Sequence, residues 1–396
     1  MKIFMLCEFY NENLEYQENL LVKYYRKHGH EVTVVTSTFE SIFDYYNDKH
    51  DNSVPEKTYY DHGAKIIKLP YRYNLLNRLR AYKKLDQILK EEKPDLIYLH
   101  CIMLNLLECI DYLKRNPGCK MIMDYHADYS NSGKNFLSLK ILHGVIRKYF
   151  LDRALPYLSK IFPIVPAGAK FLHEVYAVPY DKMDLLPLGA DTDLGSAVRE
   201  AGARRKLREK YQIGDDKIVI VSGGKLDPLK RTEELIDAVC KINNPNIYLI
   251  ILGQASGVHA AYGAMLEEKA SQNKNIKFVG WQNSVGVYEH FDMADFAVFP
   301  ASQSILWQQA ISMNLPLVVG EWSSFTNSRQ EVSYLNEEGN ILIINPQKNM
   351  QDELIEKINY LALNDGVRSD MREAAGRVTN KMLNWNNLIN KTLAFN

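Results

Sequence analysis

Two glycines and two lysines stand where a predicted strand gives way to a loop. Gly223 and Gly224 follow the apolar run 217–222, and Lys225 and Lys230 lie on the polar segment after it. Cations placed together with helix-end N–H groups stabilise negative charge that accumulates on a departing group. The spacing therefore predicts an anion-binding loop, whereas either lysine alone would more simply be a solvated side chain.

Two histidines lie at the carboxyl ends of predicted strands in the first half. His126 follows the strand 121–124 within the sequence Asp-Tyr-His-Ala-Asp, and His100 follows the strand 96–99. An imidazole in that position can orient a ligand or donate to developing charge. We expect His126 to be functional, with Asp128 close enough to hold it, and His100 to be a further candidate. A structural histidine is the alternative for both.

Metal ligands are not grouped in the sequence. It contains no His/Cys ligand cluster, and its five cysteines include no C-x-x-C pair. An odd number of cysteines without such pairs is typical of free thiols in a reducing compartment. We therefore expect no metal site. The cysteines are Cys7, Cys101, Cys109, Cys119 and Cys240.

Short apolar and β-branched runs alternate with helical periods in the first half, and these elements must position the histidines. The alternation predicts βαβ units in a parallel sheet with right-handed crossovers. The predicted strands are Lys2–Cys7, Val32–Thr36, Lys65–Leu69, Leu96–Leu99, Met121–Asp124 and Ile161–Val165, and the predicted helices are Gln17–His28, Leu75–Glu92 and Asn105–Arg115.

The same alternation restarts after a polar, helix-forming linker, Asp193–Tyr211. Strands are predicted there at Lys217–Ser222, Asn246–Leu252, Ile276–Val279, Phe296–Phe299 and Leu317–Val319, with a helix at Thr232–Ile242. The predicted fold class is α/β, with two doubly wound parallel-sheet domains, 1–190 and 191–381. Such sheets bind ligands at the carboxyl ends of their strands, so we expect a ligand cleft between the domains.

Composition bounds the function classes. The 396 residues are 46% hydrophobic and 24% charged, which excludes a disordered or collagen-like chain. Lys+Arg and Asp+Glu both number 48, and this zero net charge argues against a general nucleic-acid-coating protein. No apolar run approaches the ~20 residues of a membrane span, and Met1–Phe4 does not begin a signal peptide. We expect a cytoplasmic protein.

Five segments in order resemble motifs of GT-B glycosyltransferases, specifically the retaining enzymes of glycosyltransferase family 4. Each motif is weak by itself, but their order and spacing across the chain favour this fold. The segments are Val221–Lys230 (similar to G-R-x-x-x-x-K-G), Phe278–Trp281 (F-x-G), Ala294–Pro300 (A-D-x-x-x-x-P), Gln309–Val318 (E-A-M-A-x-G-x-P-V-V) and Pro187–Asp191 (P-N-G-V-D).

The resemblance implies two Rossmann-like domains facing across a cleft, with a final helix, 382–396, that packs back on the first domain. It implies a nucleotide-sugar donor, UDP- or GDP-linked, bound by the second domain without a metal or other cofactor. The donor-binding residues that it implies are Gly223, Gly224, Lys225, Lys230, Gly253, Trp281, Ser302, Gln303, Ser304 and Gln309. The catalytic residues that it implies are His126, which contacts the transferred sugar, and Lys225 and Lys230.

The chain departs from the family pattern at three places. Gln309 replaces the glutamate that accepts from the ribose, and the segment 301–307, where the other glutamate of the family should stand, is three residues shorter than usual. The first loop lacks the glycines of many relatives, so Tyr16 and Gln17 are expected to line the cleft with side chains. We expect these two residues, together with His100 and Asp128, to contact the acceptor.

The predicted function is transfer of a sugar to a glycan or lipid-linked acceptor with retention of configuration, in the synthesis of a surface polysaccharide, lipopolysaccharide or other glycoconjugate. The alternatives are a non-catalytic sugar-nucleotide-binding subunit, motivated by the missing glutamates, and a nucleotide-sugar epimerase of the same fold. The segment Lys65–Lys93 has nine Lys/Arg against three Asp/Glu. On the predicted helix 75–92, this excess is either the solvated face of a core helix or a peripheral contact with the inner face of the cell membrane. Nucleic acid is not an expected partner.

Overall fold

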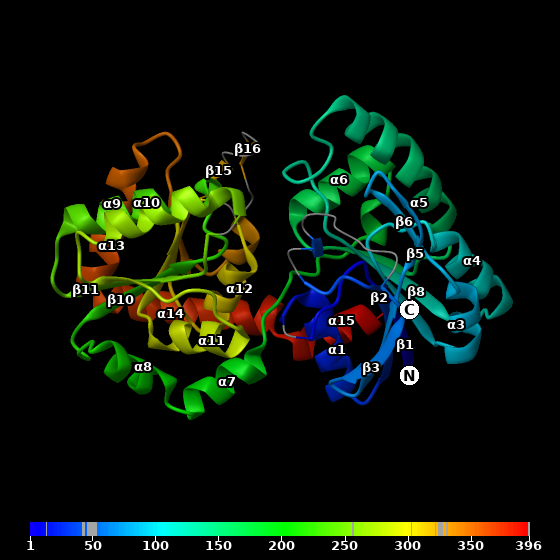
Figure 1. Cartoon of the computed structure of the whole chain (residues 1–396), viewed down its shortest axis with the longest axis horizontal. Coiled ribbons are helices and arrows are strands. Elements are labelled where there is room, and N and C mark those ends of the chain that lie inside the picture. Colours follow the sequence, from blue (N-terminus) through cyan, green and yellow to red (C-terminus); the bar gives the residue numbers. More distant parts are fainter. Residues whose placement is uncertain are drawn as a thin grey trace. The chain divides into compact units, whose positions relative to one another are not determined.

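The computed structural model describes residues 1–12, 14–41, 44–45, 54–255, 257–301, 303–320, 322–323, 328–329 and 332–394. These residues form two compact units, each with its own sheet and core (Figure 1). The first unit comprises Met1–Pro187 and Leu388–Asn396, and the second comprises Leu188–Asn387. The prediction of two doubly wound α/β domains is therefore confirmed.

The sheet of the first unit has seven strands in the order β3-β4-β2-β1-β7-β8-β9. All neighbours are parallel except β3 and β4, which form an antiparallel pair at one edge. Its central strands are almost wholly buried, as expected for a parallel sheet covered on both faces. The strands are β1 (Lys2–Leu6), β2 (Glu31–Ser37), β3 (Lys57–Asp61), β4 (Ala64–Leu69), β7 (Leu96–His100), β8 (Lys120–Tyr125) and β9 (Lys160–Pro163).

Helices connect these strands and cover the sheet. They are α1 (Gln17–Lys27), α3 (Leu85–Glu92), α4 (Leu106–Arg115), the π-helix η1 (Leu137–Arg147), α5 (Lys148–Ala154) and α6 (Pro166–Tyr176). The last helix, α15 (Trp385–Leu393), brings the end of the chain back to this unit. Its Thr392 Oγ1 lies 2.6 Å from the buried Tyr25 hydroxyl of α1, and Lys391 Nζ lies 2.8 Å from an Asp184 carboxylate oxygen.

The second unit has a six-stranded parallel sheet in the order β12-β11-β10-β13-β14-β17. The strands are β10 (Ile218–Gly223), β11 (Ile247–Leu252), β12 (Ile276–Phe278), β13 (Phe296–Phe299), β14 (Leu317–Gly320) and β17 (Ile341–Ile344). The main helices are α7 (Thr192–Glu200), α8 (Ala203–Tyr211), α9 (Thr232–Ile242), α10 (Ala260–Ala270), α11 (Ser284–Met293), α12 (Ile305–Ser312), α13 (Met350–Leu363) and α14 (Asp365–Val378).

Strand order places a topological switch point in each sheet. From β1 the chain moves to β2 on one side and later returns to β7 on the other; from β10 it moves to β11 and later returns to β13. The connections leave on opposite faces at such a point, and a ligand crevice opens outside the carboxyl ends of the two central strands. The first unit should therefore use residues after β1 and β7, and the second should use residues after β10 and β13.

The predicted helix Leu75–Glu92 is wrong over its first half. Tyr71–Leu75 (β5) and Leu79–Tyr82 (β6) form an antiparallel hairpin instead, and only α3 is helical. Leu76 and Asn77 close the hairpin with φ values of 52° and 53°, and Lys84 with φ 59° separates it from the helix. The leucine spacing was compatible with a helix, but strand pairing determines the structure here. The apolar residues of the predicted helix also do not share one buried face, because Leu75 is exposed while Leu85 and Leu89 are buried.

Among the residues that the structure describes, no helix is both long enough and apolar enough to cross a membrane.

Candidate functional site

The site in the first unit lies at the switch point of its sheet. His100 is the last residue of β7, and His126 is the first residue after β8. Cys101, directly after His100, has φ 69°, so the chain turns sharply once the histidine has been placed. The two imidazole rings lie side by side, with their centroids 4.3 Å apart. The structure thus brings together two histidines that lie on separate strand ends in the sequence.

Asp124, two residues before His126, is hydrogen-bonded to His100 and lies close to the His126 ring. Its side chain is fully buried, and its Oδ2 atom lies 3.0 Å from His100 Nδ1 and 3.5 Å from His126 Nε2. The Tyr98 hydroxyl, which is also buried, donates to the same oxygen at 2.9 Å. A buried carboxylate is stable only when it is paired and hydrogen-bonded, and these neighbours meet that requirement for Oδ2, whereas the buried Oδ1 atom has no hydrogen-bond partner.

The pKa values of the group follow from this pairing. Burial by itself would raise the pKa of Asp124, but its interactions with the neighbouring histidines, above all with His100, outweigh burial and lower that pKa. Burial likewise opposes the charge on His100, but the Asp124 carboxylate raises the pKa of His100 to about 9. Burial and the nearby His100 charge lower the pKa of His126. At neutral pH the group therefore holds one imidazolium, on His100, and a neutral imidazole, on His126.

The same trio is where a metal ion could bind. Within the described part of the chain, His100, Asp124 and His126 form the one group of three candidate ligands whose atoms all lie within 4.8 Å of one another. Two imidazoles and a carboxylate suit Zn²⁺ or a similar ion. In the structure, however, the shared oxygen already accepts the Tyr98 hydroxyl and faces both rings, which is the arrangement of a hydrogen-bonded ion pair.

Asp128 braces the loop that carries His126. Its Oδ1 atom accepts from the backbone N–H of Ser130 at 2.6 Å and of Asn131 at 3.3 Å. The Asn131 side chain in turn donates to the carbonyl of His126 at 2.9 Å. Asp128 therefore does not hold the imidazole as expected; its carboxylate fixes the loop, and the link to His126 runs through Asn131 and the backbone.

The loop after β1 leads polar side chains into the interior of the first unit. Tyr16 occupies the N-cap position of α1 and packs edge-on against Phe9, at a centroid distance of 6.3 Å. Gln17 is 2% exposed, and its amide oxygen and nitrogen are both buried without a hydrogen-bond partner. Glu18 is buried as well, and burial raises its pKa even though the charge of His100 opposes this rise. An unsatisfied buried amide usually awaits a ligand or water.

In the second unit, glycines pack two strand ends against each other. A Cβ atom on Gly253 would lie 1.9 Å from the Gly224 carbonyl oxygen, and one on Gly223 would lie 2.5 Å from the Leu252 carbonyl oxygen. Gly224 and Gly253 also have φ values of 132° and 108°, a region that favours glycine. These glycines let the loops after β10 and β11 approach closely beside the lysine loop, and the Gly224 N–H donates to the Leu252 carbonyl at 3.1 Å.

The lysine loop runs from Gly224 to the start of α9. Asp227 accepts from the Leu229 backbone N–H at 2.9 Å, so its carboxylate shapes the loop. Lys230 passes beside Gly224, where an added Cβ atom would lie 3.9 Å from Lys230 Cε. Burial lowers the pKa of both Lys225 and Lys230, and each lysine's pKa is partly restored by Asp227. A partly desolvated ammonium gains from an anionic ligand that replaces its lost water.

Helix α12 follows β13 on the other side of the switch point. Ser304 occupies its N-cap position in extended conformation but makes no side-chain capping bond. Gln303 donates to the Tyr334 hydroxyl at 2.7 Å. Gln309, one turn into the helix, is 5% exposed, and its Oε1 atom is buried without a hydrogen-bond partner. The helix therefore combines first-turn N–H groups with a buried acceptor that has no protein donor.

Two of the predicted donor-binding residues remain, Trp281 and Ser302. Trp281 is 48% exposed and follows Gly280, whose carbonyl accepts from the Gly253 N–H at 2.8 Å. That bond brings the loop carrying the indole next to the glycine loops. Ser302 lies outside the described residues.

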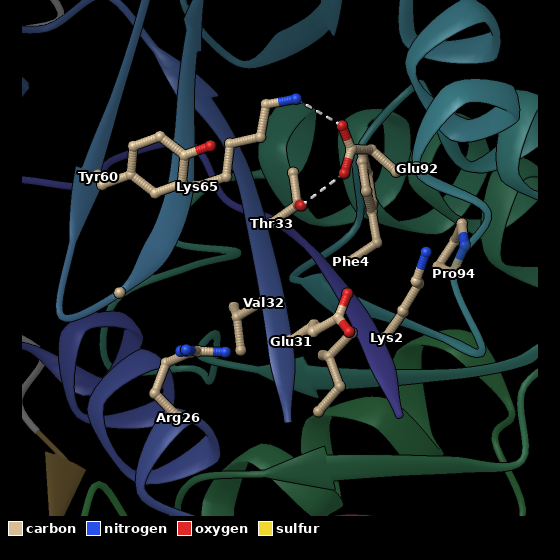
Figure 2. Close-up of a pocket in the computed structure, with 12 residues that line it drawn as sticks. Lys2, Phe4, Arg26, Glu31, Val32, Thr33, Tyr60, Lys65, Glu92 and Pro94 are labelled. Atoms are coloured by element: carbon tan, nitrogen blue, oxygen red, sulfur yellow. Dashed lines mark hydrogen bonds and ion pairs between the residues drawn. The ribbon is translucent and has the colours of Figure 1, made fainter. Parts of the chain in front are cut away.

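A pocket at the opposite edge of the first sheet is a different feature (Figure 2). It lies at the amino ends of the strands, where Lys2, Glu31 and Lys65 stand at or near the starts of β1, β2 and β4. Its Glu92 carboxylate accepts hydrogen bonds from Lys65 Nζ at 2.7 Å and from the Thr33 hydroxyl at 2.9 Å. Because α/β sheets bind ligands at their carboxyl edge, we assign this pocket no part in the site.

The sequence pattern assigns no role to three residues of the site. They are Asp124, which stands in the same motif as His126, together with Tyr98 and Glu18. Their common signal is a polar side chain inside or next to an apolar run: Tyr98 and Asp124 lie within strands, and Glu18 lies in the first turn of α1. Their partners come from other elements, so the sequence pattern by itself could not assign them.

Comparison with known proteins identifies both halves of the chain. Residues 19–194 match the family described as Glycosyltransferase Family 4, and residues 203–378 match the family described as Glycosyl transferases group 1. A D-inositol 3-phosphate glycosyltransferase of Stackebrandtia nassauensis is 27% identical over 110 residues. That alignment covers 26% of this chain and 24% of the relative, so the chain spans about a quarter of that curated relative's length.

Solved structures share the whole fold. A glycosyltransferase from Rickettsia africae superposes with a TM-score of 0.68 at 15% identity, covering 99% of this chain and 96% of that one. Anabaena Alr3699/HepE in complex with UDP-glucose superposes with a TM-score of 0.65 at 16% identity, covering 100% and 99%. At this identity the likeness establishes the GT-B fold. Together with the two family matches, it places the chain among the GT-B glycosyltransferases of family 4 and group 1.

Proposed function

We propose that this glycosyltransferase moves a sugar from a nucleotide-sugar donor to a glycan or lipid-linked acceptor, with retention of the anomeric configuration. The observation that carries the proposal is the lysine loop at the switch point of the second sheet. There Lys225 and Lys230, both with lowered pKa, lie beside the closely packed Gly223, Gly224 and Gly253. Two partly desolvated cations on one loop suit the diphosphate of such a donor.

The lysines would act mainly on the leaving group. When the sugar–phosphate bond breaks, negative charge grows on the departing diphosphate. Cations that are already in place stabilise this charge more in the transition state than in the bound donor, and this difference accelerates the reaction. N–H groups in the first turn of α12 can add to this stabilisation from the other side of the switch point.

Gln309 is proposed to accept a hydrogen bond from the ribose of the donor. Its buried Oε1 atom has no partner in the protein, and a ribose hydroxyl would satisfy it. A carboxylate at this position would be buried near the diphosphate at an electrostatic cost, whereas the amide accepts the same bond without charge. Trp281, half exposed next to the glycine loops, is the proposed contact for the base.

His126 is the proposed sugar contact in the first unit. A neutral imidazole can donate one hydrogen bond to a sugar hydroxyl or to developing charge, and the lowered pKa keeps His126 in this form. Tyr16, Gln17, His100 and Asp128 remain our proposed acceptor residues. Of these, Gln17 has the strongest support, since both polar atoms of its buried amide lack a partner.

The donor is proposed to be a UDP- or GDP-sugar, with UDP-glucose the first to test because Alr3699/HepE binds it on the same fold. The product is proposed to enter a surface polysaccharide, lipopolysaccharide or other glycoconjugate. The reaction is proposed to need no metal, because the lysines supply the positive charge that a metal would otherwise provide.

The test is turnover with a panel of UDP-, GDP-, ADP- and CMP-sugars, with and without EDTA. We expect release of one nucleoside diphosphate at an unchanged rate in EDTA. A non-catalytic donor-binding subunit would bind a nucleotide sugar without ever releasing its sugar, and that result would refute the enzymatic proposal. Full inhibition by EDTA that added metal reverses, together with loss of both activity and metal binding in Asp124→Asn, would instead assign the His100–Asp124–His126 trio to a metal.

A further inference from the structure

The helix η1 carries an exposed apolar ridge. Leu137, Ile141, Val145 and Tyr149 recur at every fourth residue along η1 and the start of α5, and all four are exposed. Phe136, directly before the helix, is 71% exposed. Single exposed apolar residues are normal, but five along one helical segment favour a surface that binds a partner.

The β5–β6 hairpin adds a second apolar projection. Leu76 at its tip is 92% exposed, and Leu75 beside it is 55% exposed. Leu76 also holds a φ of 52°, a left-handed conformation that is uncommon outside Gly, Asn and Asp. Neither burial nor the preference of the turn explains a leucine here. An exposed leucine in this strained conformation points to a role outside the fold.

The hairpin and the helix belong to one surface. The Arg147 guanidinium, in the last turn of η1, donates to the carbonyl of Arg78 next to the hairpin tip at 3.2 Å. Figure 1 shows the β5–β6 hairpin and α5 on the same side of the first unit. The apolar ridge, Phe136 and the hairpin tip are called here the apolar rim.

Positive charge surrounds the apolar rim. In a protein of zero net charge, the segments 70–85 and 129–151 together contain nine Lys/Arg and no Asp or Glu. Some of these cations are paired within the protein: Arg80 pairs with Glu8, and Lys84 pairs with Glu56. Arg72, Lys83 and Lys140 are exposed on the hairpin and on the helix. An apolar strip edged by cations matches an anionic lipid surface, whereas protein interfaces are depleted in lysine.

We propose that the apolar rim docks the protein on an anionic lipid bilayer. Leu76, Phe136 and the ridge of η1 enter the headgroup region, and Arg72, Lys83 and Lys140 face the lipid phosphates. The inference deepens the proposed function and rests on it in one respect, because a chain held at a bilayer would glycosylate a lipid-linked acceptor. It also moves the predicted membrane contact from a helix at 75–92 to the hairpin tip and η1.

The first experiment measures binding of the full chain to vesicles by sedimentation, without donor. One vesicle is phosphatidylcholine alone, and the other contains about a third phosphatidylglycerol. We expect binding to the anionic vesicle only, and a loss of about tenfold or more in the Leu76→Asp/Phe136→Asp variant. The matched control is Val258→Asp/Leu363→Asp, at residues of the second unit that are 94% and 77% exposed. The control should bind vesicles like the wild type.

The second experiment reverses charge and leaves the apolar residues intact. Arg72→Glu/Lys140→Glu should abolish the preference for anionic vesicles, while Lys206→Glu/Lys274→Glu in the second unit should not. The proposal is overturned if the wild type ignores anionic vesicles, or if either control loses as much binding as its partner variant. It is also overturned if light scattering shows a dimer that Leu76→Asp/Phe136→Asp dissolves, since the rim would then bind a second copy.

Nucleotide-sugar binding and turnover on a water-soluble acceptor separate this inference from the proposed function. The rim variants should retain both, because their changes lie outside the proposed donor and acceptor residues. A wild type that binds anionic vesicles but turns over no donor would refute the proposed function and leave the docking surface standing. The reverse result would refute the docking surface alone.

Discussion

His100 Nδ1 lies 3.0 Å from the fully buried Oδ2 of Asp124, so an imidazolium and a carboxylate face each other where β7 and β8 end. The pair joins neighbouring strands of the first sheet, at residues in register with each other. It therefore serves two purposes: it stabilises the strand ends and it keeps the charge off His126.

The first prediction concerns the pH dependence of stability. The pKa of His100 is raised from 6.5 to about 9 in the folded protein. Its contribution should therefore be complete below pH 6.5 and be lost as pH rises through about 9. We expect the wild type to lose on the order of 2 kcal/mol of unfolding free energy over this window relative to His100→Gln.

Hydrogen exchange of amides in β7 and β8 measures this loss in the first unit alone. Comparison with His100→Gln cancels the stability contributions of other groups that titrate in the same window, including the cysteines. Parallel pH profiles for the two proteins would show that the ion pair has no energetic role.

The second prediction concerns Lys230. Replacement by Ala should remove a charge-assisted hydrogen bond of roughly 1.5–3 kcal/mol and weaken nucleoside diphosphate binding by about one to two decades. Lys274→Ala, an exposed lysine of the same unit, is the control. Calorimetric titration with UDP and GDP gives the affinities. Equal affinities for Lys230→Ala and the wild type would remove Lys230 from the phosphate site.

The third prediction separates binding from stability at Gln309. Gln309→Met preserves volume and removes the buried oxygen that has no partner in the protein. Nucleotide affinity should fall by about 1–2 kcal/mol, while the unfolding free energy should change by less than about 1 kcal/mol. Denaturant melts of the free protein and titration with UDP provide the two values. A large loss of stability with unchanged affinity would make Gln309 a structural residue.

How much of the fold the sequence predicted depends on the element. Thr232–Ile242 and Phe296–Phe299 were predicted with the observed bounds, because helical and strand periods were each bounded by polar residues. The hairpin at Tyr71–Tyr82 was missed because its leucines also fit a helical period. Its turn residues, Leu76 and Asn77, are not a typical Asn-Gly pair, so nothing local indicated a reversal.

The candidate site likewise contains residues that the sequence predicted and residues that it did not. Strand ends can be located from local patterns, and His100, His126 and the lysine loop were placed at strand ends for that reason. The roles of Asp124 and Tyr98 depend on which strands are neighbours. Strand order is set by packing of whole units, and a single sequence does not encode it in any local segment.

The fourth prediction concerns His126. Its replacement by Ala should lower turnover by more than it weakens nucleotide binding, because the proposed contact is with the sugar. His28→Gln, an exposed histidine of the first unit, is the control. Steady-state kinetics and UDP titration on the same preparations provide the comparison. Equal losses of turnover and nucleotide affinity would instead indicate a nucleotide contact.

The last prediction is stereochemical. If Lys225 and Lys230 hold the departing diphosphate, its oxygen can take the proton of the acceptor hydroxyl on the face from which it leaves. The new bond then forms on that face, and no carboxylate of the chain needs to form a covalent intermediate. The first product should therefore keep the anomeric configuration of the donor. Proton NMR of the anomeric signal, recorded early in the reaction, decides this. An inverted product would require attack from the opposite face by an acceptor activated by a base, which the lysine loop cannot provide.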